Sequence, residues 1–361
     1  RQSLVRAMAA AFAGDDGPAP EGLDRLASAV AATLPPIEAI LALKGDRGRG
    51  DGEIVIADYT RGEGATALIG DGFAWGLRAR PAGQPRIESG KDGQPDRLHL
   101  ESTPSAHFDP LWGGLQSNGE REAGSLGGVD RAGRVLRTPK VRIEGGTVWH
   151  RVRGHLQIFT CVDSHVLLVG PLYGATLQTV DTQGEWKWVR QDLGSDLDWR
   201  RGHLVHVEYV PIAGGADVAE VVASSSEPWR AEPLPAAVAE RLPAEGADAA
   251  AVATVVRGLV GEALAAAREG TLASGPRAAV SAAVLDRLLG AAPIDGTGEP
   301  LTALLAQARE LESARTTITA TARLASAIAP AILDGNGVDQ PVLAKGSAAR
   351  PAAIVPRRFL E

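Results

Sequence analysis

Aromatic residues and histidines are confined to the middle of this chain, and that segregation constrains its fold more than any other feature. The chain has 7 Trp, 3 Tyr and 5 Phe, and all of them except Phe12 and Phe359 lie between Tyr59 and Trp229. All 7 His lie in the same stretch, whereas the flanks are rich in Ala and Leu. Aromatic and β-branched residues favour strands, and Ala and Leu favour helices. The sequence therefore predicts an α+β chain with a β domain between two helical arms.

Composition and charge exclude several classes of protein. The chain has 361 residues and a formal net charge of −7, so it has no basic excess for nucleic acid and we expect no such partner. Its single cysteine, Cys161, excludes an internal disulfide, a cysteine-rich zinc or iron–sulfur site and a haem attached within the chain. No apolar run reaches the roughly 20 residues of a membrane span, so we expect no transmembrane segment. Because the chain starts at Arg1 without a signal-like segment, we expect it to be a piece of a longer protein.

The N-terminal arm covers residues 1–52. Apolar residues recur at helical spacing in two runs, 4–12 and 23–34, separated by a cluster of Asp, Pro and Gly. The arm ends in a linker rich in Gly, Asp and Arg. It is therefore predicted to be helical up to that linker.

The C-terminal arm covers residues 231–330 and has three runs of helical periodicity, which predict a hairpin or small bundle. Leu304, Leu311 and Ile318 are seven positions apart in the longest run. We interpret this spacing as packing within the bundle rather than as a dimerisation coil, because the heptad pattern is short and imperfect. Residues 331–361 are expected to form an extended C-terminal segment.

Residues 53–230 show the alternation typical of short strands. Such strands, divided by Gly, Asp and Pro turns, favour an antiparallel β-sandwich over an α/β sheet. We expect a fold of the jelly-roll, concanavalin or galactose-binding-like kind. Residues 78–128 have little periodicity and are interpreted as long loops. Strands are predicted at 54–56, 140–143, 147–153, 156–163, 165–169, 175–180, 186–189, 203–210 (ended by Pro211) and 218–222.

Several separated stretches resemble a known group of proteins. These stretches are Trp149–Gly174, Trp188–Glu208 and Asp334–Glu361, together with Ile56–Tyr59 and Phe73–Gly76 near the start of the β domain. They resemble large planctomycete proteins with cytochrome-c-associated domains of unknown function, in which a sandwich-like insert separates two conserved domains. The resemblance covers roughly residues 53–361, and the Ala344–Gly346 string departs from the family's usual Ile-Arg-Gly-like pattern.

The resemblance implies a setting rather than a reaction. It implies a segment of a larger exported protein, in the periplasm or at the cell surface, whose partners are the remaining domains of that protein. Many members carry a haem c segment upstream, so any haem would lie outside this chain. Similar inserts are suspected to bind carbohydrate.

The usual signatures of catalysis are weak. No Gly-x-Ser-x-Gly elbow and no phosphate-binding loop occur. Asp192, Asp196, Asp198 and Glu208 are close in the sequence and could act in glycoside hydrolysis, but their separations cannot be derived from it. We therefore do not expect an enzyme, and keep part of a polysaccharide hydrolase as the alternative. A structural spacer for a haem-c-containing protein is a third interpretation.

Metal ligands are also few. His206 and Glu208 share one face of a predicted strand, but the sequence identifies no third ligand, and we interpret that face as solvated. Asp58 and Glu220 lie near the first and last strands, where sandwich domains often hold structural calcium. They are the candidates for a calcium site.

Carbohydrate binding has the best physical support in the sequence. An exposed aromatic ring can stack on the apolar face of a sugar while polar neighbours bind its hydroxyls. Trp149 and Trp188 are expected in the core. The expected ligand is a polysaccharide or glycan. The candidate contacts are Trp112 and Tyr173 for stacking and Asp163, His165, Arg200 and His203 for polar contacts.

Overall fold

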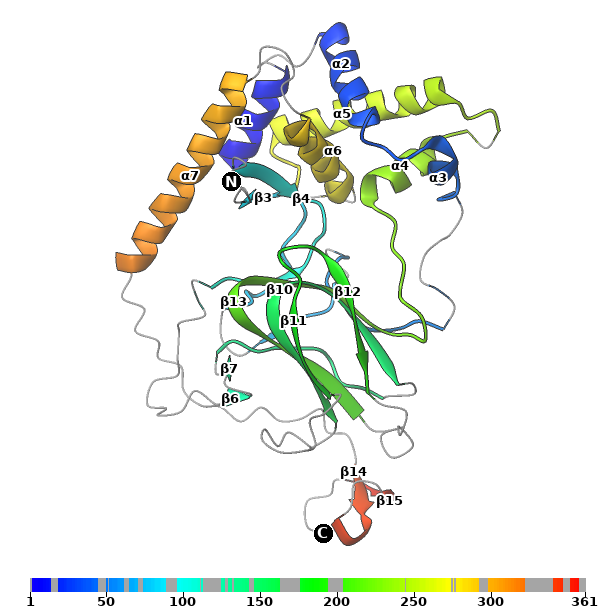
Figure 1. The fold of residues 1–361 in the computed structure, drawn as a ribbon, viewed down its shortest axis with the longest axis vertical. Coiled ribbons are helices and arrows are strands. Elements are labelled where there is room, and N and C mark those ends of the chain that lie inside the picture. The colour runs from blue at the N-terminus through cyan, green and yellow to red at the C-terminus, as the bar shows by residue number, and fades with distance from the viewer. Residues whose placement is uncertain are drawn as a thin grey trace.

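The described part of the protein has a layer of helices above a curved β-sheet, with a small C-terminal hairpin below the sheet (Figure 1). The computed structural model describes residues 2–13, 19–44, 50, 52–61, 65–70, 74–88, 96–110, 112, 125–126, 129–131, 133–142, 146–162, 176–193, 204–243, 245–273, 275, 277–291, 298–321, 340–346 and 351–356. The helices are α1 (Gln2–Ala13), α2 (Pro20–Ala31), α3 (Ile37–Leu41), α4 (Pro233–Arg241), α5 (Ala249–Glu269), α6 (Ala278–Gly290) and α7 (Gly298–Thr321). The strands of the sheet are β1 (Ile54–Asp58), β2 (Ile69–Gly70), β5 (Ala106–Phe108), β8 (Leu136–Arg137), β9 (Val141–Arg142), β10 (Thr147–Val162), β11 (Leu177–Asp181), β12 (Lys187–Asp192) and β13 (Leu204–Ala223). Three separate hairpins are β3 (Gln84–Glu88) with β4 (Arg97–Glu101), β6 (Ser125–Leu126) with β7 (Val129–Asp130), and β14 (Gln340–Leu343) with β15 (Pro351–Val355).

Two long strands, β10 and β13, form the spine of the sheet. They pair from Val148 opposite Ala223 to Val162 opposite Val205. The other edge of β10 pairs with β11 and β12, and the other edge of β13 pairs with β1, β5, β8 and β9. Every described pair is antiparallel, which confirms the predicted α+β class with an antiparallel sheet.

β10 and β13 are each continuous where the sequence predicted two strands. The prediction ended one strand at Pro211 and broke the other before Leu156, but β13 and β10 run through these positions. The register shifts between Arg153 and Leu156, which bends the pair without ending it. Gly154 has a φ of 114°, and a Cβ there would lie 2.7 Å from the carbonyl oxygen of Gly215. Glycine therefore permits a close crossing inside the strand, where the sequence suggested a turn.

The prediction of long loops over residues 78–128 was wrong in part. This stretch contains the β3–β4 hairpin and β5, which pairs with β13. Leu98 and Leu100 of β4 are buried in the core of the helical layer, so the hairpin belongs to that layer. Alternation over five residues was too short to stand out among the Gly and Pro residues around it.

The two predicted arms form one helical layer with a single core. α5 lies at its centre and packs against α1, α2 and α6. The side chain of Asp248 caps α5 by accepting a hydrogen bond from the backbone N–H of Ala251 at 2.8 Å, and Gly270 ends the helix in the left-handed conformation. Met8 and Val260 are fully buried between these helices.

α5 is also the one described helix that is long and apolar enough to cross a membrane. The expectation that no apolar run approaches this length was therefore too strict. A third of the apolar window (33%) is buried inside the protein. Core helices of soluble proteins and membrane spans share this length and composition.

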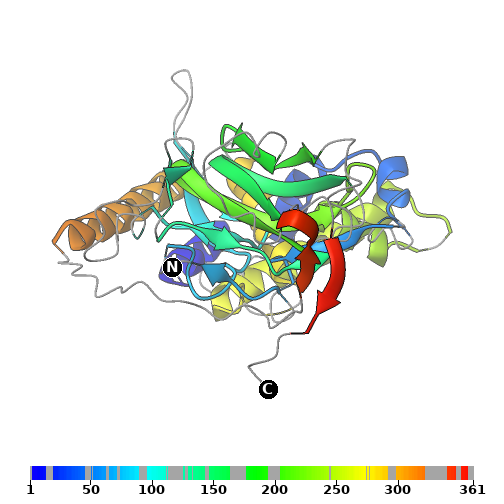
Figure 2. The same ribbon diagram turned by 90° about the horizontal axis from the view of Figure 1, so that it is seen from below.

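The prediction of a long last helix is confirmed, but only its first half packs. Leu304 and Ala308 of α7 are buried in the helical core. Leu311 and Ile318 are 46% and 68% exposed. Figures 1 and 2 show the end of α7 extending to one side of the body. Of the three residues spaced by seven, only Leu304 packs in the bundle, and Leu311 and Ile318 lie on an exposed face.

One face of the sheet has an apolar core of its own. Trp75 and Phe108 meet edge to face with ring centroids 5.5 Å apart, and Trp75 donates a hydrogen bond from Nε1 to the carbonyl oxygen of Arg134. His150 is fully buried in this region and its Nδ1 lies 2.8 Å from the hydroxyl of Tyr209. Burial lowers the pKa of His150 to about 3, against a hydrogen bond with Gln191 that raises it.

Candidate functional site

The opposite face of β10 carries alternating tryptophan and arginine. Val148 and Val152 point into the apolar core, so Trp149, Arg151 and Arg153 point the other way. Guanidinium groups at this depth need acceptors, because burying an unpaired charge is costly. The neighbouring strands supply those acceptors in two rows that run across the sheet.

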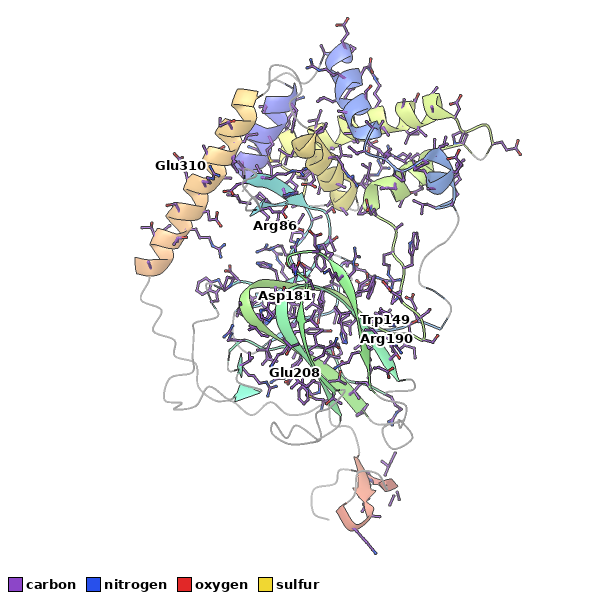
Figure 3. The ribbon with its side chains drawn as sticks, viewed as in Figure 1. Arg86, Trp149, Asp181, Arg190, Glu208 and Glu310 are labelled. Carbon is purple, nitrogen blue, oxygen red and sulfur yellow. The ribbon has the colours of Figure 1, made fainter. Side chains whose placement is uncertain are left out.

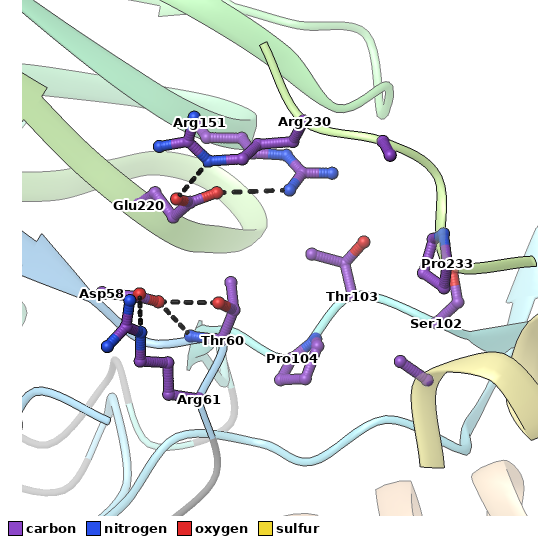
Figure 4. A pocket seen from close by; sticks show the side chains of 12 residues that line it. Asp58, Thr60, Arg61, Ser102, Thr103, Pro104, Arg151, Glu220, Arg230 and Pro233 are labelled. Atoms are coloured by element: carbon purple, nitrogen blue, oxygen red, sulfur yellow. Dashed lines mark hydrogen bonds and ion pairs between the residues drawn. The ribbon is translucent and has the colours of Figure 1, made fainter. Parts of the chain in front are cut away.

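The first row is Arg151, Glu220 and Asp58, which lie opposite one another on β10, β13 and β1. Arg151 donates from Nη1 to Oε2 of Glu220 over 3.4 Å. Asp58 accepts hydrogen bonds from the backbone and hydroxyl of Thr60 at 2.9 and 2.7 Å, and from Nε of Arg61 at 2.8 Å (Figure 4). Both carboxylates are buried, yet each has a guanidinium partner.

Arg230, from the segment between β13 and α4, completes this row. It donates from Nε to Oε1 of Glu220 and from Nη2 to Oε2 of Glu53, both over 2.8 Å. Glu220 is thus shared by two guanidinium groups, those of Arg151 and Arg230. Burial lowers the pKa of Arg151 and the charge of Arg230 adds to that effect, whereas Glu220 raises it.

The second row is Arg153, Asp217 and His107, on β10, β13 and β5. Arg153 donates to Oδ2 of Asp217 from Nε at 3.0 Å and from Nη2 at 2.7 Å, and to Glu101 from Nη1 at 2.6 Å. Oδ1 of Asp217 lies 2.8 Å from Nδ1 of His107 and accepts the hydroxyl of Ser105 at 2.9 Å. Burial would raise the pKa of Asp217, but the contacts with His107 and Arg153 hold it well below its usual value. Through Glu101 this row connects the sheet to the hairpin of the helical layer.

Trp186, just before β12, and Trp188, within it, contact these arginines with their rings. The ring of Trp186 lies 4.9 Å from the guanidinium carbon of Arg153 and 5.8 Å from that of Arg151. The ring of Trp188 lies 5.6 Å from that of Arg230. Such cation–π contacts hold flat guanidinium groups in one orientation. Trp188 is half-buried on the charged face, so the prediction that it lies in the core was wrong. Trp149 is buried, at 9% exposure, and donates a hydrogen bond from Nε1 to the carbonyl oxygen of Ser224.

A cavity of about 390 Å³ opens beside the first row, between the sheet and the helical layer (Figure 4). We call it the interlayer pocket. Eight of its twelve lining residues are polar or charged, and they supply three guanidinium groups, two carboxylates and three hydroxyls. The lining residues are Asp58, Thr60, Arg61, Ser102, Thr103, Pro104, Arg151, Glu220, Arg230, Ala231, Pro233 and Ala279.

A second polar cluster lies at the end of the sheet away from the helices, where Figure 3 labels Glu208. Cys161 faces His206 in the register of β10 and β13, and these two side chains with Glu208 bring their ligand atoms within 4.8 Å of one another. All three residues are buried, so the interpretation of a solvated face at His206 and Glu208 was wrong. The third ligand was missed because strand pairing, and not sequence spacing, places Cys161 there.

The surroundings of this cluster argue against a metal ion. Arg131 forms an ion pair with Glu208, and Nε of Arg137 lies 2.8 Å from Oε1 of the same carboxylate. Burial and the charges of Arg137, Lys140 and Arg131 lower the pKa of His206 to about 4, and burial raises that of the Cys161 thiol to about 12. A divalent cation would meet several positive charges and a protonated thiol. Cys161, His206 and Glu208 are therefore residue types that bind metals, but the positive charges around them and the protonated thiol do not suit a cation.

The structure brings together only part of the predicted site. Asp58 and Glu220 meet across the sheet at the interlayer pocket, but guanidinium groups neutralise both carboxylates, so the pair does not fit a calcium ion. Trp112 is half-buried and packs against the apolar core of the sheet, which supports a packing role, and its stacking on sugar stays a prediction. The remaining candidates lie outside the described residues: Asp163, His165, Tyr173, Arg200 and His203.

The sequence pattern around the arginines of the site weakly indicates a charged face of the sheet. Arg151 and Arg153 alternate with valines on one strand, which is unusual for a strand buried on both faces. That pattern could have marked a charged face that needs acceptors. It could not have named Glu220 and Asp217, which are more than 60 positions away and depend on strand register.

No protein-family model matches this chain, and no curated protein matches it.

Proposed function

We propose that this chain is a non-catalytic recognition and scaffold segment that binds carbohydrate in the interlayer pocket. The observation that carries the proposal is the lining of that pocket, which sets guanidinium donors, carboxylate acceptors and hydroxyl groups around one cavity. A polyhydroxylated ligand needs donors and acceptors interleaved at short range. Arg151, Glu220 and Asp58 supply both in a row fixed by strand register.

The size and stiffness of the pocket support this assignment. Its volume of about 390 Å³ falls in the range of roughly 300–1,000 Å³ typical of small-ligand sites, and suits one or two sugar rings. The ion pairs and the tryptophans behind Arg151 and Arg230 hold the polar groups in place before a ligand arrives. Preorganised groups lose little entropy on binding.

The finer fold and the setting belong to the same proposal. An antiparallel sheet enclosing an apolar core is compatible with a jelly-roll, concanavalin or galactose-binding-like sandwich. The role as a segment of a larger exported planctomycete-type protein rests on the sequence resemblance. A glycan or polysaccharide is the proposed partner, and the other domains of the longer protein are the proposed neighbours.

Removal of the pocket hydroxyls tests the proposal. A glycan array would first identify a ligand, and calorimetric titration would then compare wild type with a Ser102→Ala/Thr103→Ala variant. Two lost hydrogen bonds at about 1 kcal/mol each correspond to roughly 30-fold weaker binding. A matched control is Thr316→Ala/Thr317→Ala, which removes two hydroxyls from exposed positions on α7.

The control variant should bind like wild type. Equal affinity in all three proteins, or no binding by the wild type to any glycan, would contradict the proposal. Release of reducing ends from a bound polysaccharide would contradict its non-catalytic part and favour the hydrolase alternative.

A further inference from the structure

The guanidinium group of Arg151 has more donors than acceptors. Its one described hydrogen bond runs from Nη1 to Glu220 over 3.4 Å, and its side chain is 23% exposed. Within the described part of the chain, Nε and Nη2 have no acceptor. These N–H groups belong to a residue that lines the interlayer pocket.

The one carboxylate partner of Arg151 is also shared with a second arginine. Glu220 is the acceptor for both Arg151 and Arg230, and it lies closer to Arg230, at 2.8 Å. Glu53, the other partner of Arg230, is 5% exposed and does not line the pocket. Arg230 therefore has two carboxylate partners at 2.8 Å, whereas Arg151 has only a shared carboxylate at 3.4 Å.

Arg61 adds a second accessible cation to the same cavity. Its side chain is 56% exposed and uses Nε for Asp58. Figure 4 shows Arg61 and Arg151 at the same side of the pocket, with Asp58 and Glu220 between them. A guanidinium group pairs well with a carboxylate, because two parallel N–H groups match its two oxygens.

From this arrangement we infer that the interlayer pocket selects an acidic sugar, a uronate, whose carboxylate binds the unused N–H groups of Arg151. This inference rests on the proposed function and adds a substrate class to it. The ring hydroxyls of such a sugar would meet Ser102, Thr103 and Glu220, and its carboxylate would give Arg151 a close anionic partner of its own. Trp186, which lies over Arg151, keeps the guanidinium plane fixed for that contact.

The test compares one sugar with and without its charge. Digalacturonate and its methyl ester have the same rings and hydroxyls and differ in the carboxylate groups. Calorimetric titration at pH 7 should show wild type binding the acid at least tenfold more tightly than the ester. Arg151→Gln should lower that ratio to about one, because it removes the guanidinium group that distinguishes the acid from the ester. Arg190→Gln is the matched control, because Arg190 is 57% exposed and pairs with Asp192 on the strand edge.

The outcomes separate this inference from the proposed function. If wild type binds acid and ester equally, or if Arg151→Gln keeps the preference, the uronate inference is overturned and carbohydrate binding stands. If inorganic phosphate or acetate alone competes as well as digalacturonate, the pocket recognises an anion and not a sugar acid, which also overturns it. If neither sugar binds and no other glycan does, the proposed function fails. Circular dichroism of Arg151→Gln checks folding, and Arg151→Lys, which retains the charge, should recover part of the preference.

Discussion

Arg153 and Asp217 face each other across β10 and β13, and Nη2 of the arginine lies 2.7 Å from Oδ2 of the aspartate. Both side chains are buried, at 10% and 5% exposure. The pair is also the centre of a network, since Arg153 reaches Glu101 of the helical layer and Asp217 reaches His107. One ion pair therefore helps to fix both the register of the sheet and the position of the helices above it.

Replacement of Asp217 should destabilise the protein strongly. Asp217→Asn leaves the Arg153 charge buried with half of its partners, and the loss of one member of a buried pair costs about 3–5 kcal/mol. The free energy of unfolding from urea titration measures the effect. Asp192→Asn, at an ion pair more than half exposed on both sides, should change it by less than about 0.5 kcal/mol. Similar values for the two variants would show that the buried network contributes little.

Gly154 should tolerate no side chain. In Gly154→Ala the new Cβ would lie 2.7 Å from the carbonyl oxygen of Gly215, on a backbone with a φ of 114°. Strain and the clash together should lower the free energy of unfolding by about 3 kcal/mol or more. Gly184 has a φ of 82° but open space around it, so Gly184→Ala should cost only about 1 kcal/mol. The difference between the two variants measures the close crossing of β10 and β13, and a difference near zero would contradict it.

The protein should lose stability in mild acid. His150 and His206 have pKa values of about 3 and 4 in the folded protein, below the ordinary value of 6.5 that applies when the chain is unfolded. Between these values the unfolded chain binds protons that the folded protein does not, so stability is full above about pH 6.5 and falls toward pH 4. Each histidine contributes up to about 1.4 kcal/mol per pH unit in that window. Urea titrations at pH 7, 6, 5 and 4 measure the slope, and His206→Gln should reduce it. A flat profile from pH 7 to 4 would disagree with neutral, buried histidines.

Cys161 should be unreactive while the protein is folded. Its side chain is fully buried, and burial raises the pKa of the thiol to about 12, so the reactive thiolate is scarce at pH 8. Labelling with a thiol reagent should be at least about a hundredfold slower in buffer than in guanidinium chloride. Protection should persist after dialysis against a chelator, because the arginines around Glu208 argue against a bound metal. Rapid native labelling, or labelling that begins only after chelation, would contradict this description.

The sequence was enough to predict which regions are helical and which are strands, but not where the long strands end or which residues they pair. The segregation of aromatic residues from Ala and Leu was enough for the α+β class, and heptad spacing was enough for the helix that holds Leu304. Pro211 and Gly154 were interpreted as strand ends because they usually are, and only their place in the register shows that they lie in bends. The same register pairs Arg151 with Glu220 and Arg153 with Asp217. Local patterns cannot supply such pairs, since they join positions that are distant in the chain.

Filling the interlayer pocket would block the proposed carbohydrate site. Ala279 lies on α6 at the edge of that cavity, and Ala279→Trp would place an indole ring there. Calorimetric titration with the glycan identified for wild type should give no binding heat for this variant, with a thermal unfolding midpoint within a few degrees of wild type. Unchanged affinity in a folded Ala279→Trp protein would show that the ligand binds elsewhere and would contradict the assignment of the pocket.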